Sequence, residues 1–260
     1  MAAAVERLAQ RVADPDDFPV LPGSSLAGDD SASHPFEVSH AIRHLINASV
    51  DQLHAIKVLQ HDAGFEHLAA GATLARAALE NTATALWILG PSARNDRLER
   101  NYRWHVRNYQ DEMSTVGDLV GEAPARHIKQ VVAQAIKRGL NERSVQSGYA
   151  ISKPVKGAAE FTDIKIVFAW ELASAFAHGR PWAYQGYLAR SDIAHDGRGH
   201  AVRTMLPRPE LTIWLALEAM HLLGELLRLR DRRAGCDMPP MPDGSPDSGR
   251  PAHRPDKVTG

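Results

Sequence analysis

The chain has a single cysteine, Cys236, among its 260 residues. One thiol excludes a disulfide within the chain and a zinc site built from several cysteines. No apolar run reaches the roughly 18–20 residues that a membrane-spanning helix requires. No secretory signal pattern opens the sequence, so we expect a cytoplasmic protein that does not enter a membrane. The net charge of −1 is also close to zero, so no overall field indicates nucleic acid or an acidic partner.

Apolar side chains recur at helical spacing through most of the chain, which predicts an all-α fold. The candidate helices cover residues 36–59, 66–89, 92–120, 124–138, 162–178 and 209–233, with a shorter amphipathic helix over residues 2–12. Residues 141–160 are predicted to be mainly loop. A turn at residues 196–199 joins two short pieces of extended chain. We predict a bundle of six or seven helices.

Both ends of the chain are rich in residues that disfavour a packed core. Residues 14–35 carry Pro, Gly, Ser and Asp, which predict a loop or flexible arm. The Pro-rich stretch from residue 235 to residue 260 has few large apolar side chains, which predicts a disordered tail. The expected organisation is an N-terminal helix and arm (1–35), a helical bundle domain (36–234) and a disordered tail (235–260).

Charged side chains interrupt the most apolar of the predicted helices. Arg76 and Glu80 lie four residues apart among alanines and leucines, so they share one face. A later helix carries Glu171, Ser174 and His178 at spacings of three and four, again on one face. Charged groups are rarely buried without partners. We therefore predict that Arg76, Glu80 and His178 meet in a polar cluster inside the bundle. A purely structural ion pair or a water-facing stripe are the alternatives.

The same residues do not make a convincing Ser–His–Glu catalytic triad. Nothing in the sequence supplies a sharp turn at Ser174 or a nest of backbone amides for an oxyanion. The amides around a serine in the middle of a helix are already bonded within that helix. A hydrogen bond between packed helices, involving Ser174, His178 and the Arg76–Glu80 stripe, is the better interpretation.

Residues 100–105 read RNYRWH, an Arg followed by Asn, three residues and His. This string resembles the catalytic motif of HEPN-type ribonucleases, an all-helical family that cleaves single-stranded RNA without metal. The resemblance implies that Arg100 and His105 are catalytic, usually paired across a dimer. Five positions along a straight helix rotate by about 140°, so one chain alone would not converge the two side chains. The arginines around them would otherwise form a solvated face, or bind RNA phosphates with neighbouring aromatic side chains available for stacking.

Two Glu-x-x-His pairs, Glu37 with His40 and Glu218 with His221, are a feature of ferritin-like di-iron bundles. That family places a single-Glu helix before each pair, an order that this chain lacks. The composition also yields such pairs by chance. We therefore predict no metal site and no cofactor.

Three segments together carry a second resemblance: LARAALENTATALWILGP, the Arg-rich helix after it, and ELASAFAHG. They resemble a set of uncharacterised, all-helical bacterial proteins that is itself loosely HEPN-like, over about residues 66–182. The shared polar positions correspond to Arg76, Glu80, Ser174 and His178. The resemblance implies a fold rather than an activity. We expect a non-enzymatic binding or interaction module, with a homodimer, an unknown protein or a small molecule as its partner. The alternative is a HEPN-like, metal-independent ribonuclease or RNA-binding protein.

Overall fold

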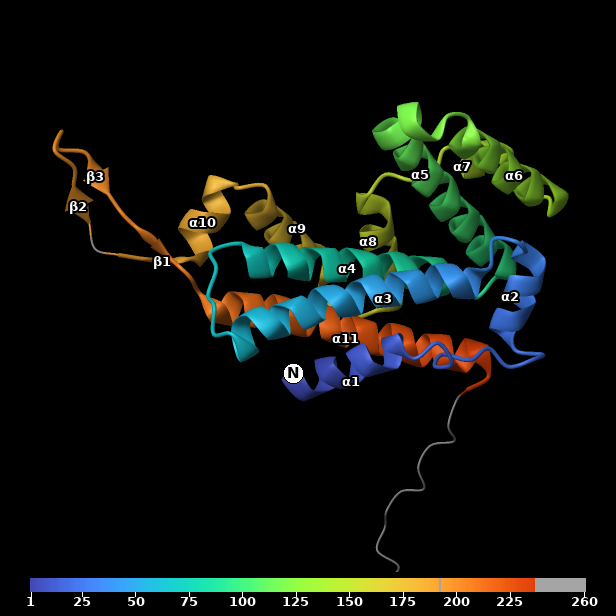
Figure 1. The fold of residues 1–260 in the computed structure, drawn as a ribbon, viewed down its shortest axis with the longest axis horizontal. Coiled ribbons are helices and arrows are strands. Elements are labelled where there is room, and N and C mark those ends of the chain that lie inside the picture. The colour runs from blue at the N-terminus through green and yellow to red at the C-terminus, as the bar shows by residue number, and fades with distance from the viewer. Residues whose placement is uncertain (192, 237–260) are drawn as a thin grey trace, which may run out of the picture.

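Three long helices lie side by side and form the centre of the molecule (Figure 1). The computed structural model describes residues 1–191 and 193–236. The central helices are α3 (Val38–Lys57), α4 (Ala70–Leu89) and α11 (Pro209–Ala234), and α4 contacts both of the others. The predicted all-α class is confirmed.

Helix α4 is the core of the bundle because its second half is buried on every side. Each residue from Thr82 to Leu89 is buried, as expected of a helix that is apolar around its circumference. The helix ends where Gly90 and Pro91 were predicted to stop it. Helix α11 instead buries one stripe, which includes Leu215, Ala219 and Leu222, and exposes its opposite side. Besides α3 and α11, helices α8 and α9 also pack against α4.

The described part of the chain contains eleven α-helices rather than six or seven. The remaining ones are α1 (Ala2–Ala13), α2 (Ser25–Ser33), α5 (Arg94–Val120), α6 (Ala123–Lys137), α7 (Glu142–Gln146), α8 (Ser152–Ala158), α9 (Ile166–Ala177) and α10 (Pro181–Tyr187). A π-helical turn (Val58–Asp62) follows α3, and a 3₁₀ turn (Ala159–Phe161) follows α8. The additional helices are the short ones: α2, α7, α8 and α10.

The prediction of loop over residues 141–160 is wrong where α7 and α8 form. Both helices are anchored by buried apolar side chains, Val145 in α7 and Val155 in α8. Helices of five and seven residues are too short for an apolar period to be recognised. Pro154 and Gly157 also signal a break, yet proline is compatible with the first turn of a helix.

The hairpin arm, described over residues 189–191 and 193–206, projects away from the bundle (Figure 1). It consists of two antiparallel pairs of two-residue strands. β1 (Ala189–Arg190) pairs with β4 (Met205–Leu206), and β2 (Ala194–His195) pairs with β3 (Ala201–Val202). The predicted turn at residues 196–199 is confirmed, and the Asp196 carboxylate accepts hydrogen bonds from the backbone amides that close it.

The N-terminal region is not a flexible arm, and that prediction is wrong for residues 25–33, which form α2. Ser24 begins this helix by accepting a hydrogen bond from the Ala27 amide. Val5, Phe18 and Leu26 belong to the same apolar core as α3 and α4. The first 35 residues are therefore part of the bundle.

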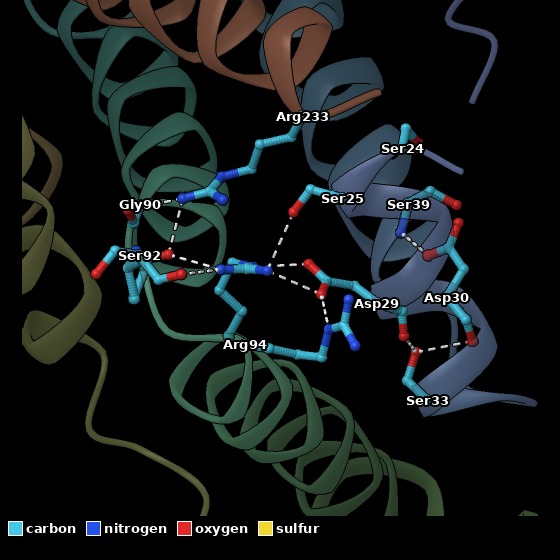
Figure 2. A network of polar contacts seen from close by, with 12 residues as sticks. Ser24, Ser25, Asp29, Asp30, Ser33, Ser39, Gly90, Ser92, Arg94 and Arg233 are labelled. Carbon is cyan, nitrogen blue, oxygen red and sulfur yellow. Dashed lines mark hydrogen bonds and ion pairs between the residues drawn. The ribbon is translucent and has the colours of Figure 1, made fainter. Parts of the chain in front are cut away.

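A buried charge network fixes α2 against the other helices (Figure 2). The fully buried Asp29 carboxylate accepts hydrogen bonds from Arg97 Nε at 2.6 Å and Arg97 Nη2 at 2.9 Å, and from Arg94 Nε at 3.2 Å. Arg97 Nη1 also donates to the carbonyls of Pro91 and Ser92, just after α4. Asp29 supplies the charge partner that permits Arg97 to be buried.

The predicted disordered tail lies outside the described residues from position 237 onward. Across residues 1–191 and 193–236, no helix combines the length and the apolar character needed to cross a membrane.

Candidate functional site

A polar cluster joins α4 to α9 and contains four side chains: Arg76, Glu80, Trp170 and Ser174. Arg76 Nη2 lies 3.0 Å from Glu80 Oε2, and Arg76 Nε donates to Ser174 Oγ at 2.8 Å. Trp170 Nε1 donates to the same Glu80 oxygen at 3.0 Å. The arginine and the glutamate lie four apart on α4, and the tryptophan and the serine lie four apart on α9. One face of each helix therefore supplies two of the four groups.

The polar cluster is half-buried rather than dry. The side chains of Arg76 and Glu80 are each 22% exposed. The Arg76 guanidinium also lies 5.7 Å from the centre of the Trp170 ring, within range of a cation–π contact. Sequence reasoning missed Trp170, although its spacing to Ser174 was a usable signal.

The predicted meeting of Arg76, Glu80 and His178 is found only for the first two. His178 and Glu171 are exposed, and within the described residues no hydrogen bond or ion pair joins either of them to the polar cluster. They line a shallow pocket of about 220 Å³ on the outer side of α9, together with Ser174. The three residues therefore share a face of α9, as predicted.

Ser174 acts as a helix-packing group and not as a nucleophile in this arrangement. Its Oγ accepts a hydrogen bond from Arg76, and no hydrogen bond to His178 is formed among the described residues. A nucleophilic serine needs a base within hydrogen-bond reach, and a guanidinium cannot accept its proton.

Arg100 and His105, the residues of the HEPN-like motif, have different surroundings. Arg100 Nη1 donates to the carbonyl of Trp87 at 2.7 Å, and its guanidinium lies over the rings of Trp87 and Phe161. His105 packs against Phe36 and Trp104, with ring centres 5.1 and 4.9 Å away. The pocket that contains Arg100 does not include His105.

His105 is also poorly placed to exchange a proton with a substrate. Its Nε2 atom is buried and has no hydrogen-bond partner among the described residues. Burial lowers the pKa of His105 from 6.5 to about 4, so the ring is neutral at pH 7. One turn earlier, Asn101 Nδ2 donates to the carbonyl of Phe36. This side of α5 is therefore part of the core.

The arginine-rich face of α5 is occupied by groups of the protein itself. Arg94 and Arg97 bind Asp29, and Arg107 forms an ion pair with the exposed Asp111 at 2.8 Å. The remaining two arginines each donate to a backbone carbonyl, Arg100 to that of Trp87 and Arg103 to that of Gly148. Three of the five arginines are thus closely paired with carboxylates, so no continuous row of guanidinium groups is left for successive phosphates of an RNA strand, although Arg100 and Arg103 keep N–H donors beside their carbonyl bonds.

An apolar hollow opens between α9 and α11, close to the base of the hairpin arm. We call it the aromatic groove, and its apolar lining is Phe168, Leu172, Tyr187, Leu211 and Trp214. Its volume is about 340 Å³. The rings of Phe168 and Trp214 lie 6.0 Å apart, and Phe168 is 48% exposed. Sequence analysis did not single out these residues, because each one separately resembles a core position of a helix.

Within the described chain, no group of three or more His, Cys, Asp or Glu side chains is arranged to hold a metal ion. Of the two Glu-x-x-His pairs, Glu37 contacts His40 at 3.5 Å and His34 at 2.6 Å. His34 and His40 are both exposed, and the pair lies at the start of α3 rather than inside the bundle.

Comparison with known proteins assigns this chain to no family. No family model matches the chain, and searches of curated proteins and of solved structures also give no match.

Proposed function

We propose that this chain is a non-enzymatic, cytoplasmic interaction module that works as a homodimer, with the aromatic groove and the hairpin arm as its contact surface. The observation that carries the proposal is an open apolar groove lined by residues of α9, α10 and α11. The hairpin arm projects from the end of the bundle where α10 and the start of α11 lie (Figure 1).

The aromatic groove has the composition of a binding surface. Tryptophan, tyrosine and phenylalanine are enriched at the centres of protein interfaces, where they contribute much of the binding energy. Phe168 and Trp214 both line it, and Phe168 is exposed while Trp214 is half-buried. The polar cluster supports this surface, because the bond from Arg76 to Ser174 holds α9 against α4. A rigid groove loses less entropy on binding.

The hairpin arm exposes several apolar side chains, although Met205 at its base packs against the core. Ile193, Val202 and Leu206 are 52%, 46% and 43% exposed. An isolated two-stranded hairpin is marginally stable in water, so an arm of this kind gains order by lying on another surface. Stable interfaces bury about 800 Å² on each partner, which is more than five groove side chains offer. The arm supplies the additional area.

A second copy of the chain can cover both the aromatic groove and the hairpin arm. In a twofold dimer the same patch faces itself, so each arm reaches the groove of the other protomer. Two arms and two grooves are then covered in one arrangement, and the exposed apolar surface of the monomer is removed from water.

The environments of Arg100 and His105 favour this proposal over RNA cleavage. Arg100 donates a hydrogen bond to the carbonyl of Trp87, and His105 lies against Phe36 with its Nε2 atom buried. A general acid–base pair needs both groups within reach of one substrate.

The test is the molar mass in solution, measured by light scattering over a range of concentrations. We expect twice the chain mass of 28.5 kDa for the wild type. Phe168→Asp and Val202→Asp each place a charge in the interface and should give the monomer mass. Leu119→Asp is the matched control, because Leu119 is 85% exposed on α5, away from this surface, and should remain dimeric. A wild-type protein that is monomeric throughout contradicts the proposal, as do Asp variants that stay dimeric.

A further inference from the structure

A small, positively lined pocket lies between α4, α5 and α8. We call it the indole pocket; it has a volume of about 290 Å³ and is lined by Trp87, Asp96, Glu99, Arg100, Arg103 and Lys153. Three cations face two carboxylates there, so one positive charge is in excess. The pocket is on a different part of the bundle from the aromatic groove, and the two share no lining residue.

The carboxylates of the indole pocket pair directly with only one of its three cations, Arg103, and at a long distance. Glu99 Oε1 accepts a hydrogen bond from Ser144 Oγ at 2.5 Å and lies 3.9 Å from Arg103. Asp96 is exposed, and neither Arg100 nor Lys153 forms an ion pair with any described residue. Burial lowers the pKa of Lys153, and the nearby charge of Arg103 lowers it further, while Glu99 acts in the opposite direction. Arg100 and Lys153 therefore have no direct ion-pair partner, although Glu160, Asp96 and Glu99 act on the Arg100 charge from a greater distance.

The arginines are held in place over the indole ring. The guanidinium carbons of Arg100 and Arg103 lie 5.4 and 5.9 Å from the centre of the Trp87 ring. Each also donates to a backbone carbonyl, Arg100 to that of Trp87 and Arg103 to that of Gly148. Each guanidinium has further N–H donors that these bonds do not use. Both guanidinium groups are therefore held in place and keep N–H donors available for a ligand.

Trp87 supplies a second, independent observation, an N–H donor without a protein partner. Only 2% of the residue is exposed, and it lines the pocket. Its Nε1–H donates no hydrogen bond to the described residues, and the nitrogen is not fully buried, so this donor is accessible to a ligand. A β-carbon on Gly157 would lie 3.1 Å from this nitrogen and 2.6 Å from Cδ1, so α8 lies along the N–H edge of the ring. Lys153, four residues before Gly157, is on the same face of α8.

We propose that the indole pocket binds a small molecule through a compact oxyanion group, a phosphate or a carboxylate. Trp87 Nε1 donates a hydrogen bond to this group, and Arg100, Arg103 and Lys153 balance its charge. Arginine donors form short, charge-assisted bonds to such oxygens. The volume is at the lower end of the range for ligand pockets, about 300–1,000 Å³, which favours a small ligand.

The test follows the indole ¹H–¹⁵N resonance of Trp87 by NMR. Single Trp→Phe variants at the five tryptophan positions assign the five indole signals. Pyrophosphate and citrate are titrated separately at constant ionic strength, so that a phosphate and a carboxylate source are distinguished. We expect a saturable shift of the Trp87 signal with at least one of them. Lys153→Ala should weaken the apparent affinity by about tenfold or more, since it removes a hydrogen bond to a charged group.

The control is Lys156→Ala, which removes an exposed lysine from the same helix but outside the pocket. It should leave the titration unchanged. Three results would overturn the inference: no saturable shift with either anion, an equal effect of the two lysine variants, or a shift that only a single-stranded oligonucleotide produces. None of these results depends on the molar mass that tests the homodimer.

Discussion

Arg97 and Asp29 form a buried, two-pronged ion pair across 68 positions of sequence, with nitrogen–oxygen distances of 2.6 and 2.9 Å. The aspartate is fully buried and the arginine is 2% exposed. Asp29 belongs to α2 and Arg97 to α5, so the pair links the first 35 residues to the bundle. Figure 2 shows the surrounding network with Asp29 labelled. Geometry of this kind offsets the cost of removing two charges from water only while both partners are present.

Asp29→Ala should therefore destabilise the protein strongly. The substitution leaves the Arg97 guanidinium buried without its counter-charge, and breaking such a pair costs about 3–5 kcal/mol. Urea unfolding followed by circular dichroism measures the loss. The control is Asp111→Ala, which breaks the exposed Arg107–Asp111 pair and should cost about 1 kcal/mol or less. Equal losses for the two variants would contradict the structural role of the buried pair.

The polar cluster should show energetic coupling between α4 and α9. Because the Arg76–Ser174 hydrogen bond is half-buried, we expect a coupling free energy of about 1 kcal/mol in a double-mutant cycle of Arg76→Ala and Ser174→Ala. The same cycle with Ser114→Ala, an exposed change on α5, should be additive. A cycle without coupling for the first pair would show that the contact does not hold the two helices together.

His105 should make stability fall as the solution becomes acidic. Burial holds its pKa at about 4 in the folded protein, against 6.5 for the unperturbed group. Between pH 4 and pH 6.5 the unfolded chain binds a proton at His105, whereas the folded chain does not. The contribution of His105 is therefore complete above pH 6.5 and is lost as the pH falls toward 4, by on the order of 3 kcal/mol in total.

The measurement compares the free energy of unfolding of wild type and His105→Leu from pH 7 to pH 4. The wild type should lose more stability than the variant over this range, while exposed His67→Leu should follow the wild type. If the free energy of unfolding of wild type and of His105→Leu changed equally with pH, the His105 ring would be protonated as readily in the folded state as in the unfolded state.

The chain should leave single-stranded RNA intact. Labelled RNA incubated with the purified protein, with and without chelator, should run unchanged on a denaturing gel. The Arg100→Ala, His105→Ala double variant, purified in parallel, serves to detect contaminating nuclease. Cleavage that the wild type performs in chelator and the double variant does not would establish the ribonuclease and contradict the interaction module.

The sequence was sufficient for the long helices and insufficient for the short ones. Helix α4 repeats its apolar pattern over five turns and ends at Gly90–Pro91, so its place was predictable. Helix α2 has nine residues rich in Ser, Asp, Ala and Gly, and its burial depends on Arg97, far away in the chain. No local sequence pattern predicts a partner so far away in the chain.

The polar cluster shows the same limit at a candidate site. Arg76 and Glu80 were predictable as a pair because helical spacing places them together. Trp170 was missed, and His178 was expected in the cluster but is not bonded to it. Spacing determines which residues share a face of α9, whereas the packing angle between α9 and α4 determines which of them reach Arg76 and Glu80.

The most direct test of the homodimer is a photo-cross-link from the hairpin arm. Benzoylphenylalanine is placed at position 202, where Val202 is exposed, and equal amounts of ¹⁴N- and ¹⁵N-labelled protein are mixed before irradiation. The account predicts mixed-isotope cross-links between the arm of one chain and peptides of α9 or α11 in the other. Cross-links only within single chains, or mixed-isotope links to other parts of the bundle, would contradict it.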